Sequence, residues 1–108
     1  MLRVTVAHDK GKEEAKRIVD QSVDDLLRSV ASGPVQILDP HKEWHDSTMT
    51  FSFRAKMGLF GSQVHGKVWV EDKQMTIEVE IPGIFRKFIS EEKIKGTLES
   101  RAKALLTA

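Results

Sequence analysis

The sequence contains no cysteine, little net charge and no long apolar run. The absence of cysteine excludes a disulfide scaffold and a thiolate zinc site, and it is compatible with the cytosol. The 17 basic and 16 acidic residues alternate along the chain and give a net charge of +1, whereas a nucleic-acid-binding surface needs basic residues gathered on one face. No apolar run approaches the roughly 20 residues that cross a bilayer, and the first residues lack the apolar stretch of a signal peptide. We therefore expect a soluble, cytoplasmic protein with no nucleic-acid partner and no transmembrane segment.

The fractions of apolar and charged residues are typical of a folded globular protein. Apolar residues make up 40% of the chain and charged residues 31%, which argues against disorder. A chain of 108 residues has room for one core and not for two. We predict a single domain over residues 1–108.

The first part of the chain predicts a strand followed by a helix. Over residues 2–7 apolar and polar side chains alternate with the period of a half-buried strand. Over residues 12–32 the apolar residues recur with the period of an amphipathic helix, and Gly33-Pro34 ends it. The apolar stripe of this helix consists of Ala15, Ile18, Val19, Val23, Leu26, Leu27 and Val30.

Four strand patterns and a second helix follow. The first strand, over residues 35–38, leads through a predicted Asp39-Pro40 turn to Trp44, and alternating patterns then cover residues 49–55, 63–70 and 75–81. Short connections predict antiparallel pairing with one buried face. The last helix is predicted to be capped by Ser90, and its apolar stripe consists of Ile94, Leu98, Ala102 and Leu105.

The predicted order is therefore β-α-β-β-β-β-α, an α+β class. Two amphipathic helices need partners, and a one-sided sheet offers a single apolar face. The simplest arrangement is a curved antiparallel sheet with both helices on its concave face, like the TATA-box-binding-protein fold or a reduced helix-grip fold. Such an analogy predicts architecture and not function.

Motifs that carry chemistry are missing. The four histidines, His8, His41, His45 and His65, are not paired at metal-binding spacing, and His41 and His45 with Asp46 surround a turn. The sequence contains no nucleophile elbow, phosphate-binding glycine loop or dinucleotide fingerprint. We predict no catalytic, cofactor or metal site, and hence a protein that is not an enzyme.

Apolar residues at positions where polar ones are usual point to an interaction surface. The connection over residues 57–61 is apolar, and Trp69 lies on the polar side of its strand. Phe85 and Ile89 fall off the stripe of the last helix, so either a separate helical turn packs there or these two apolar side chains are left over. Exposed apolar clusters mark an interface, a ligand groove or a membrane-like surface, although each residue alone could equally pack inside the protein. The predicted surface consists of Met57, Leu59, Phe60, Trp69, Phe85 and Ile89.

Four segments resemble a known family. They are residues 4–15, the Trp44 region with residues 50–53, residues 66–70 and residues 77–82. Together they are similar to the polyhydroxyalkanoic acid system proteins, also called granule-region proteins, over nearly the whole chain. The turn after Trp44 departs from the family's glycine-aspartate pair, because it reads His45-Asp46, and residues 57–60 are more apolar than in other members.

The resemblance implies a bacterial protein that acts at or near polyhydroxyalkanoate granules, with no defined active site. The leading hypothesis is a non-enzymatic cytoplasmic protein whose apolar surface contacts the polymer surface, a granule protein or a second copy of itself. The alternative is a carrier of an acyl-type ligand in a cavity between sheet and helix, lined by Phe51, Phe53, Val68, Ile77 and Leu98. An enzyme would instead need polar groups that converge in that cavity, with His8 or His65 inside it.

Overall fold

The computed structural model describes residues 1–30, 35–86 and 90–107. The order of its elements is the predicted β-α-β-β-β-β-α, with one short 3₁₀ helix before the last α-helix. The elements are β1 (Leu2–Ala7), α1 (Lys12–Val30), β2 (Val35–His45), β3 (Thr48–Met57), β4 (Phe60–Val70), β5 (Gln74–Glu80), η1 (Gly83–Phe85) and α2 (Glu91–Thr107).

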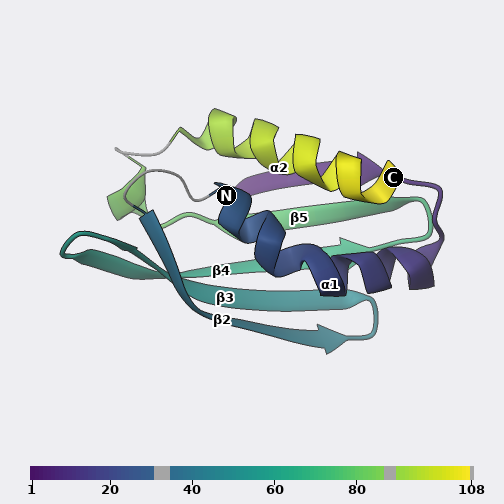
Figure 1. Ribbon diagram of the computed structural model, residues 1–108, viewed down its shortest axis with the longest axis horizontal. Coiled ribbons are helices and arrows are strands. Elements are labelled where there is room, and N and C mark those ends of the chain that lie inside the picture. The colour runs from purple at the N-terminus through teal and green to yellow at the C-terminus, as the bar shows by residue number, and fades with distance from the viewer. Residues whose placement is uncertain (31–34, 87–89, 108) are drawn as a thin grey trace.

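The five strands form one open sheet in the order β1-β5-β4-β3-β2, and every neighbouring pair is antiparallel. Both α-helices lie on the same face of this sheet, and none of the described elements covers the other face (Figure 1). α2 packs on β1 and on α1, which lies over the central strands. The α+β class and the two-helices-on-one-face arrangement are thus confirmed.

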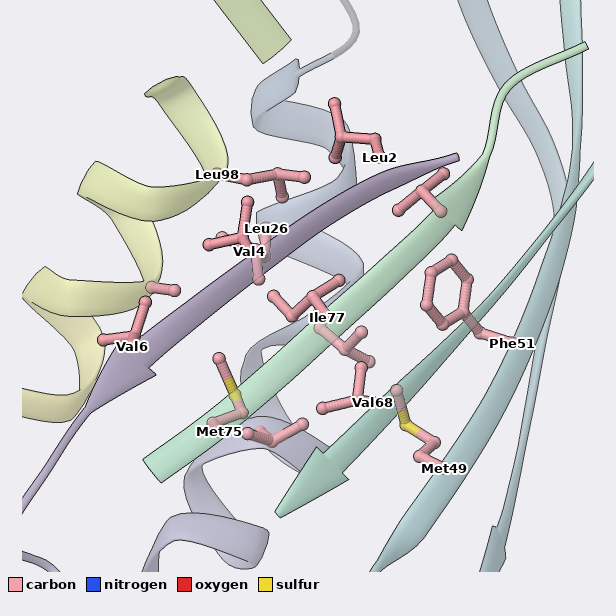
Figure 2. Close-up of a cluster of buried hydrophobic side chains, with 14 of the residues drawn as sticks. Leu2, Val4, Val6, Leu26, Met49, Phe51, Val68, Met75, Ile77 and Leu98 are labelled. Atoms are coloured by element: carbon pink, nitrogen blue, oxygen red, sulfur yellow. The ribbon is translucent and has the colours of Figure 1, made fainter. Parts of the chain in front are cut away.

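Strand alternation decides which side chains enter the core. On β1, Leu2, Val4 and Val6 are buried and the residues between them are exposed. The same alternation continues across β5, β4 and β3, so that one apolar face meets the helices (Figure 2). The helices contribute Ala15, Val19, Val23 and Leu26 from α1, and Leu98, Ala102 and Leu106 from α2.

β2 differs from its prediction, because it is one strand of 11 residues and not two segments joined by a turn. Asp39 has a φ of 50°, and the pairing with β3 shifts between Leu38 and His41. This is a β-bulge, which tolerates a proline that has no N–H to donate. The bulge bends β2, as Figure 1 shows, and it lets both Ile37 and Trp44 pack against the core.

The two α-helices begin at different kinds of cap. Ser90 caps α2 as predicted, because its Oγ accepts a hydrogen bond from the Lys93 N–H at 3.3 Å. At the start of α1, the Lys12 N–H donates to Asp72 Oδ1 at 3.0 Å, so that the cap comes from the β4–β5 hairpin. The predicted Gly33-Pro34 stop lies outside the described residues.

Candidate interaction surface

The β3–β4 hairpin carries the most exposed apolar side chains. Its strands pair without a break up to Met57 and Phe60, so the connection is a two-residue turn of Gly58 and Leu59. Gly58 has a φ of 61°, the positive value that a type II′ hairpin turn requires at its first central position. The turn forms the left-hand extremity of the molecule in Figure 1, beyond the ends of both helices.

Exposure increases toward this turn. Met57 is half-buried and packs against the edge of the core, Phe60 is 54% exposed, and Leu59 is fully exposed at 100%. The strand alternation places Met57 and Phe60 on the helix-covered side of the sheet, at a point that neither helix reaches. We call Met57, Leu59 and Phe60 the hairpin tip.

Trp69 does not join the hairpin tip. It lies at the opposite end of β4 and on the uncovered face, between Thr48 of β3 and Thr76 of β5. Its side chain is half-buried, and Thr76 beside it is buried with its Oγ1 at 3.2 Å from Thr5 Oγ1. Trp69 therefore lies in line with threonines of the neighbouring strands, and its position does not extend the hairpin tip.

The assignment of Phe85 to an interaction surface is wrong. Phe85 lies in η1 and not in the last helix, and it is only 1% exposed within the main core. Projecting residues 84–89 onto one continuous helix placed its side chain off the stripe, whereas the separate 3₁₀ turn directs it inward. The sixth predicted residue, Ile89, lies outside the described residues.

Two basic residues accompany the hairpin tip on the uncovered face of the sheet. Arg54 and Lys56 are both exposed, and in the described part of the chain neither forms an ion pair. Arg54 leans toward the turn, because its Nη2 lies 3.1 Å from where a Cβ on Gly61 would be. The sequence analysis missed this pairing of charge with apolar residues. The available signal was the absence of any acidic residue between Asp46 and Glu71.

A row of polar side chains crosses the uncovered face of the sheet and was also missed. The register sets His41, Ser52, His65 and Glu80 opposite one another on four neighbouring strands. His41, His65 and Glu80 are exposed, and no hydrogen bond joins Ser52 to His65 or His65 to Glu80 among the described side chains. Nor do the described residues contain a group of three side chains placed to hold a metal ion.

The interior holds a small cavity between the helices and the sheet. Its lining includes Phe51, Val68, Ile77 and Leu98, four of the five residues that the carrier alternative predicted. The volume is about 20 Å³, which is room for one water molecule and not for an acyl chain. Neither His8 nor His65 lines it.

Residues 2–106 match a protein family described as "putative polyhydroxyalkanoic acid system protein". The chain belongs to this family. The match covers nearly the whole chain and confirms the resemblance noted in the sequence. A comparison with curated proteins gives no significant match.

The residues that carry the family resemblance occupy structural positions. Trp44 donates its indole N–H to Asp20 Oδ1 at 2.8 Å and so ties β2 to α1. This hydrogen bond, followed by that of Lys42, lowers the pKa of Asp20 below its usual value. Gly66 leaves space for the ring of Phe51 from the neighbouring strand. Trp44 and Gly66 therefore stabilise the packing of the fold.

None of the α-helices in the described ranges is long and apolar enough to span a membrane. Within the described residues, the hairpin tip is the place where large apolar side chains are most exposed.

Proposed function

We propose that this member of the polyhydroxyalkanoic acid system acts in the cytoplasm as a non-enzymatic protein that attaches to the surface of polyhydroxyalkanoate granules through its hairpin tip. The observation that carries the proposal is the full exposure of Leu59 next to the 54% exposure of Phe60, at one end of the molecule's long axis. The family match supports the connection with the polymer system.

Burial of the hairpin tip supplies the driving force. Complete removal of a Leu or Phe side chain from water is worth about 1.5–3 kcal/mol. Because Leu59 is fully exposed and Phe60 is 54% exposed, the two together contribute roughly 2–5 kcal/mol, which is reduced by the cost of association. A single hairpin tip thus binds weakly and reversibly, as suits attachment to a surface that offers many equivalent places.

Two features favour binding over catalysis. Among the described residues, the row of Ser52, His65 and Glu80 forms none of the hydrogen bonds that would activate a nucleophile, and it lies on the face of the sheet opposite α1 and α2. The carrier alternative has less support than the granule proposal, because the interior cavity would have to expand many-fold to hold an acyl chain.

The test is co-sedimentation of the purified protein with isolated polyhydroxyalkanoate granules. The double variant Leu59→Ser/Phe60→Ser is expected to lose most of its binding, whereas its circular dichroism should stay unchanged because both side chains are exposed. Leu38→Ser is the matched control, because Leu38 is also an exposed apolar residue but lies on β2.

The outcomes separate the possible partners. Undiminished sedimentation of the double variant would contradict the assignment of the hairpin tip. Binding that is lost after the granules are treated with protease would make a granule protein the partner. A wild-type dimer that the double variant converts to monomers, together with no granule binding, would mean that the hairpin tip contacts a second copy.

A further inference from the structure

Two basic residues, Arg54 and Lys56, lie near the hairpin tip, but not at the same place on the hairpin as its apolar residues. Leu59 occupies the turn, Met57 and Phe60 lie on the helix-covered side of the sheet, and Arg54 and Lys56 lie on the uncovered side. The hairpin is therefore apolar at its end and basic behind it. A surface that is apolar inside and negatively charged outside matches both features.

We propose that this hairpin recognises an anionic phospholipid layer. Leu59 and Phe60 insert into this layer, while Arg54 and Lys56 contact the lipid headgroups. The inference rests on the proposed function, because it names the chemistry of the granule surface that the hairpin tip meets. Apolar side chains beside basic ones are the usual means by which proteins attach to the surface of such a layer.

The spacing along the hairpin fits the thickness of a lipid headgroup region. Lys56 lies about two residues behind the turn, which corresponds to roughly 7 Å along a strand. The polar region of a bilayer is about 5–8 Å thick on each side. When Leu59 reaches the acyl chains, the ammonium group of Lys56 therefore lies at the level of the phosphates, and the long side chains can extend along the strand to reach them.

The charges near the hairpin tip are free to act on such a surface. Neither Arg54 nor Lys56 is ion-paired with a described residue, whereas Arg3, at the other edge of the sheet, is paired with Glu78 at 3.3 Å. The nearest acidic residue along the neighbouring strand is Asp39, which follows the residue opposite Arg54 and forms no ion pair with it. The local field at the hairpin tip is therefore positive although the whole chain is almost neutral.

The test is flotation of the full chain with two kinds of vesicle, one of phosphatidylcholine alone and one of equal parts phosphatidylcholine and phosphatidylglycerol. Binding to the anionic vesicles is expected, with less at high salt because the headgroup attraction is screened. Each lost basic residue should lower the partition coefficient about fivefold, so Arg54→Gln/Lys56→Gln should lower it on the order of 25-fold. Arg101→Gln/Lys103→Gln removes two exposed charges from α2 and should change it little.

Three results would overturn the inference. They are equal binding to both vesicles, a loss of binding that is the same for the two double variants, and no vesicle binding at all. If the protein sediments with granules and with lipid-free polymer particles but ignores vesicles, the granule proposal stands and the lipid inference fails. If it binds anionic vesicles through Arg54 and Lys56 but ignores granules, the granule proposal fails, and the anionic lipid surface that the hairpin recognises is not that of a granule.

Discussion

The ring of Phe51 on β3 lies directly over Gly66 on β4. A Cβ built on Gly66 would come within 2.2 Å of Phe51 Cζ and 2.5 Å of the Glu78 carbonyl oxygen. The two residues are register partners, and the Phe51 ring also stacks on that of Phe53 with centroids 6.4 Å apart. The space that a side chain on Gly66 would occupy is therefore filled by an aromatic ring from the next strand.

Gly66→Ala should destabilise the protein. The added methyl group collides with backbone on one side and with a packed ring on the other, so relaxation has to move a strand or displace Phe51. Overpacking of this kind costs about 1–3 kcal/mol. Urea denaturation should show a lower midpoint with an unchanged slope, and an unchanged midpoint would mean that the ring moves aside freely.

Gly96→Ala should stabilise the protein, and it therefore provides a matched comparison with Gly66→Ala. Gly96 lies within α2, is exposed, and has nothing within 4 Å of the position that a Cβ would occupy. Alanine is favoured over glycine in a helix by up to about 1 kcal/mol. The same urea titration should show a higher midpoint, and a lower one would indicate that α2 needs glycine for a reason other than space.

The fold could be predicted from the sequence because its periodic patterns agree with its packing. The alternation over residues 2–7 and the helical stripe from Ala15 to Leu26 each specify one buried face, and one sheet face is enough to cover both helices. The Asp39-Pro40 turn was predicted wrongly because the same two residues also suit a bulge. Only the pairing with β3 distinguishes a bulge from a turn, and that pairing is a tertiary property.

The candidate surface was only partly predictable for a similar reason. The exposure of Leu59 and Phe60 follows from their place in a short apolar connection, which is a local feature. Whether Phe85 turns inward depends on a 3₁₀ turn that its own sequence does not specify. The position of Arg54 beside the hairpin tip depends on the space above Gly61, which appears only when β3 and β4 pair.

Asp20 should make stability depend on pH in the acidic range. Its pKa is lowered in the folded protein, chiefly by the hydrogen bond from Trp44, so the carboxylate stabilises the fold above the ordinary aspartate pKa near 4. This contribution is lost as the pH falls through the lowered value. The side chain is 49% exposed, so the effect should be less than about 1 kcal/mol.

The measurement is the difference in unfolding free energy between wild type and Asp20→Asn as a function of pH. We expect wild type to be more stable at pH 7 and the difference to shrink steadily below about pH 4. Asp24→Asn on the same helix is the control, because the described contacts between α1 and β2 are made by Asp20 and not by Asp24, so this variant should show no such trend. A constant difference across this range would contradict the assigned role of Asp20.

His8 should be required for stability and not for binding. It is 8% exposed, its Nε2–H donates to the Glu71 carbonyl oxygen at 2.9 Å, and its Nδ1 accepts from the Lys10 N–H at 3.2 Å. One neutral ring thus joins the start of α1 to the β4–β5 hairpin, whose Asp72 also caps α1. His8→Phe keeps the ring volume but removes both hydrogen bonds and leaves the partly buried Glu71 carbonyl oxygen without its imidazole donor, at a cost of about 1–3 kcal/mol. Thermal and urea unfolding should both show this loss of stability. Co-sedimentation with granules at low temperature should stay at the wild-type level, because His8 pairs with the β4–β5 hairpin, at the end of the sheet away from the hairpin tip. A selective loss of granule binding would instead make His8 part of the contact.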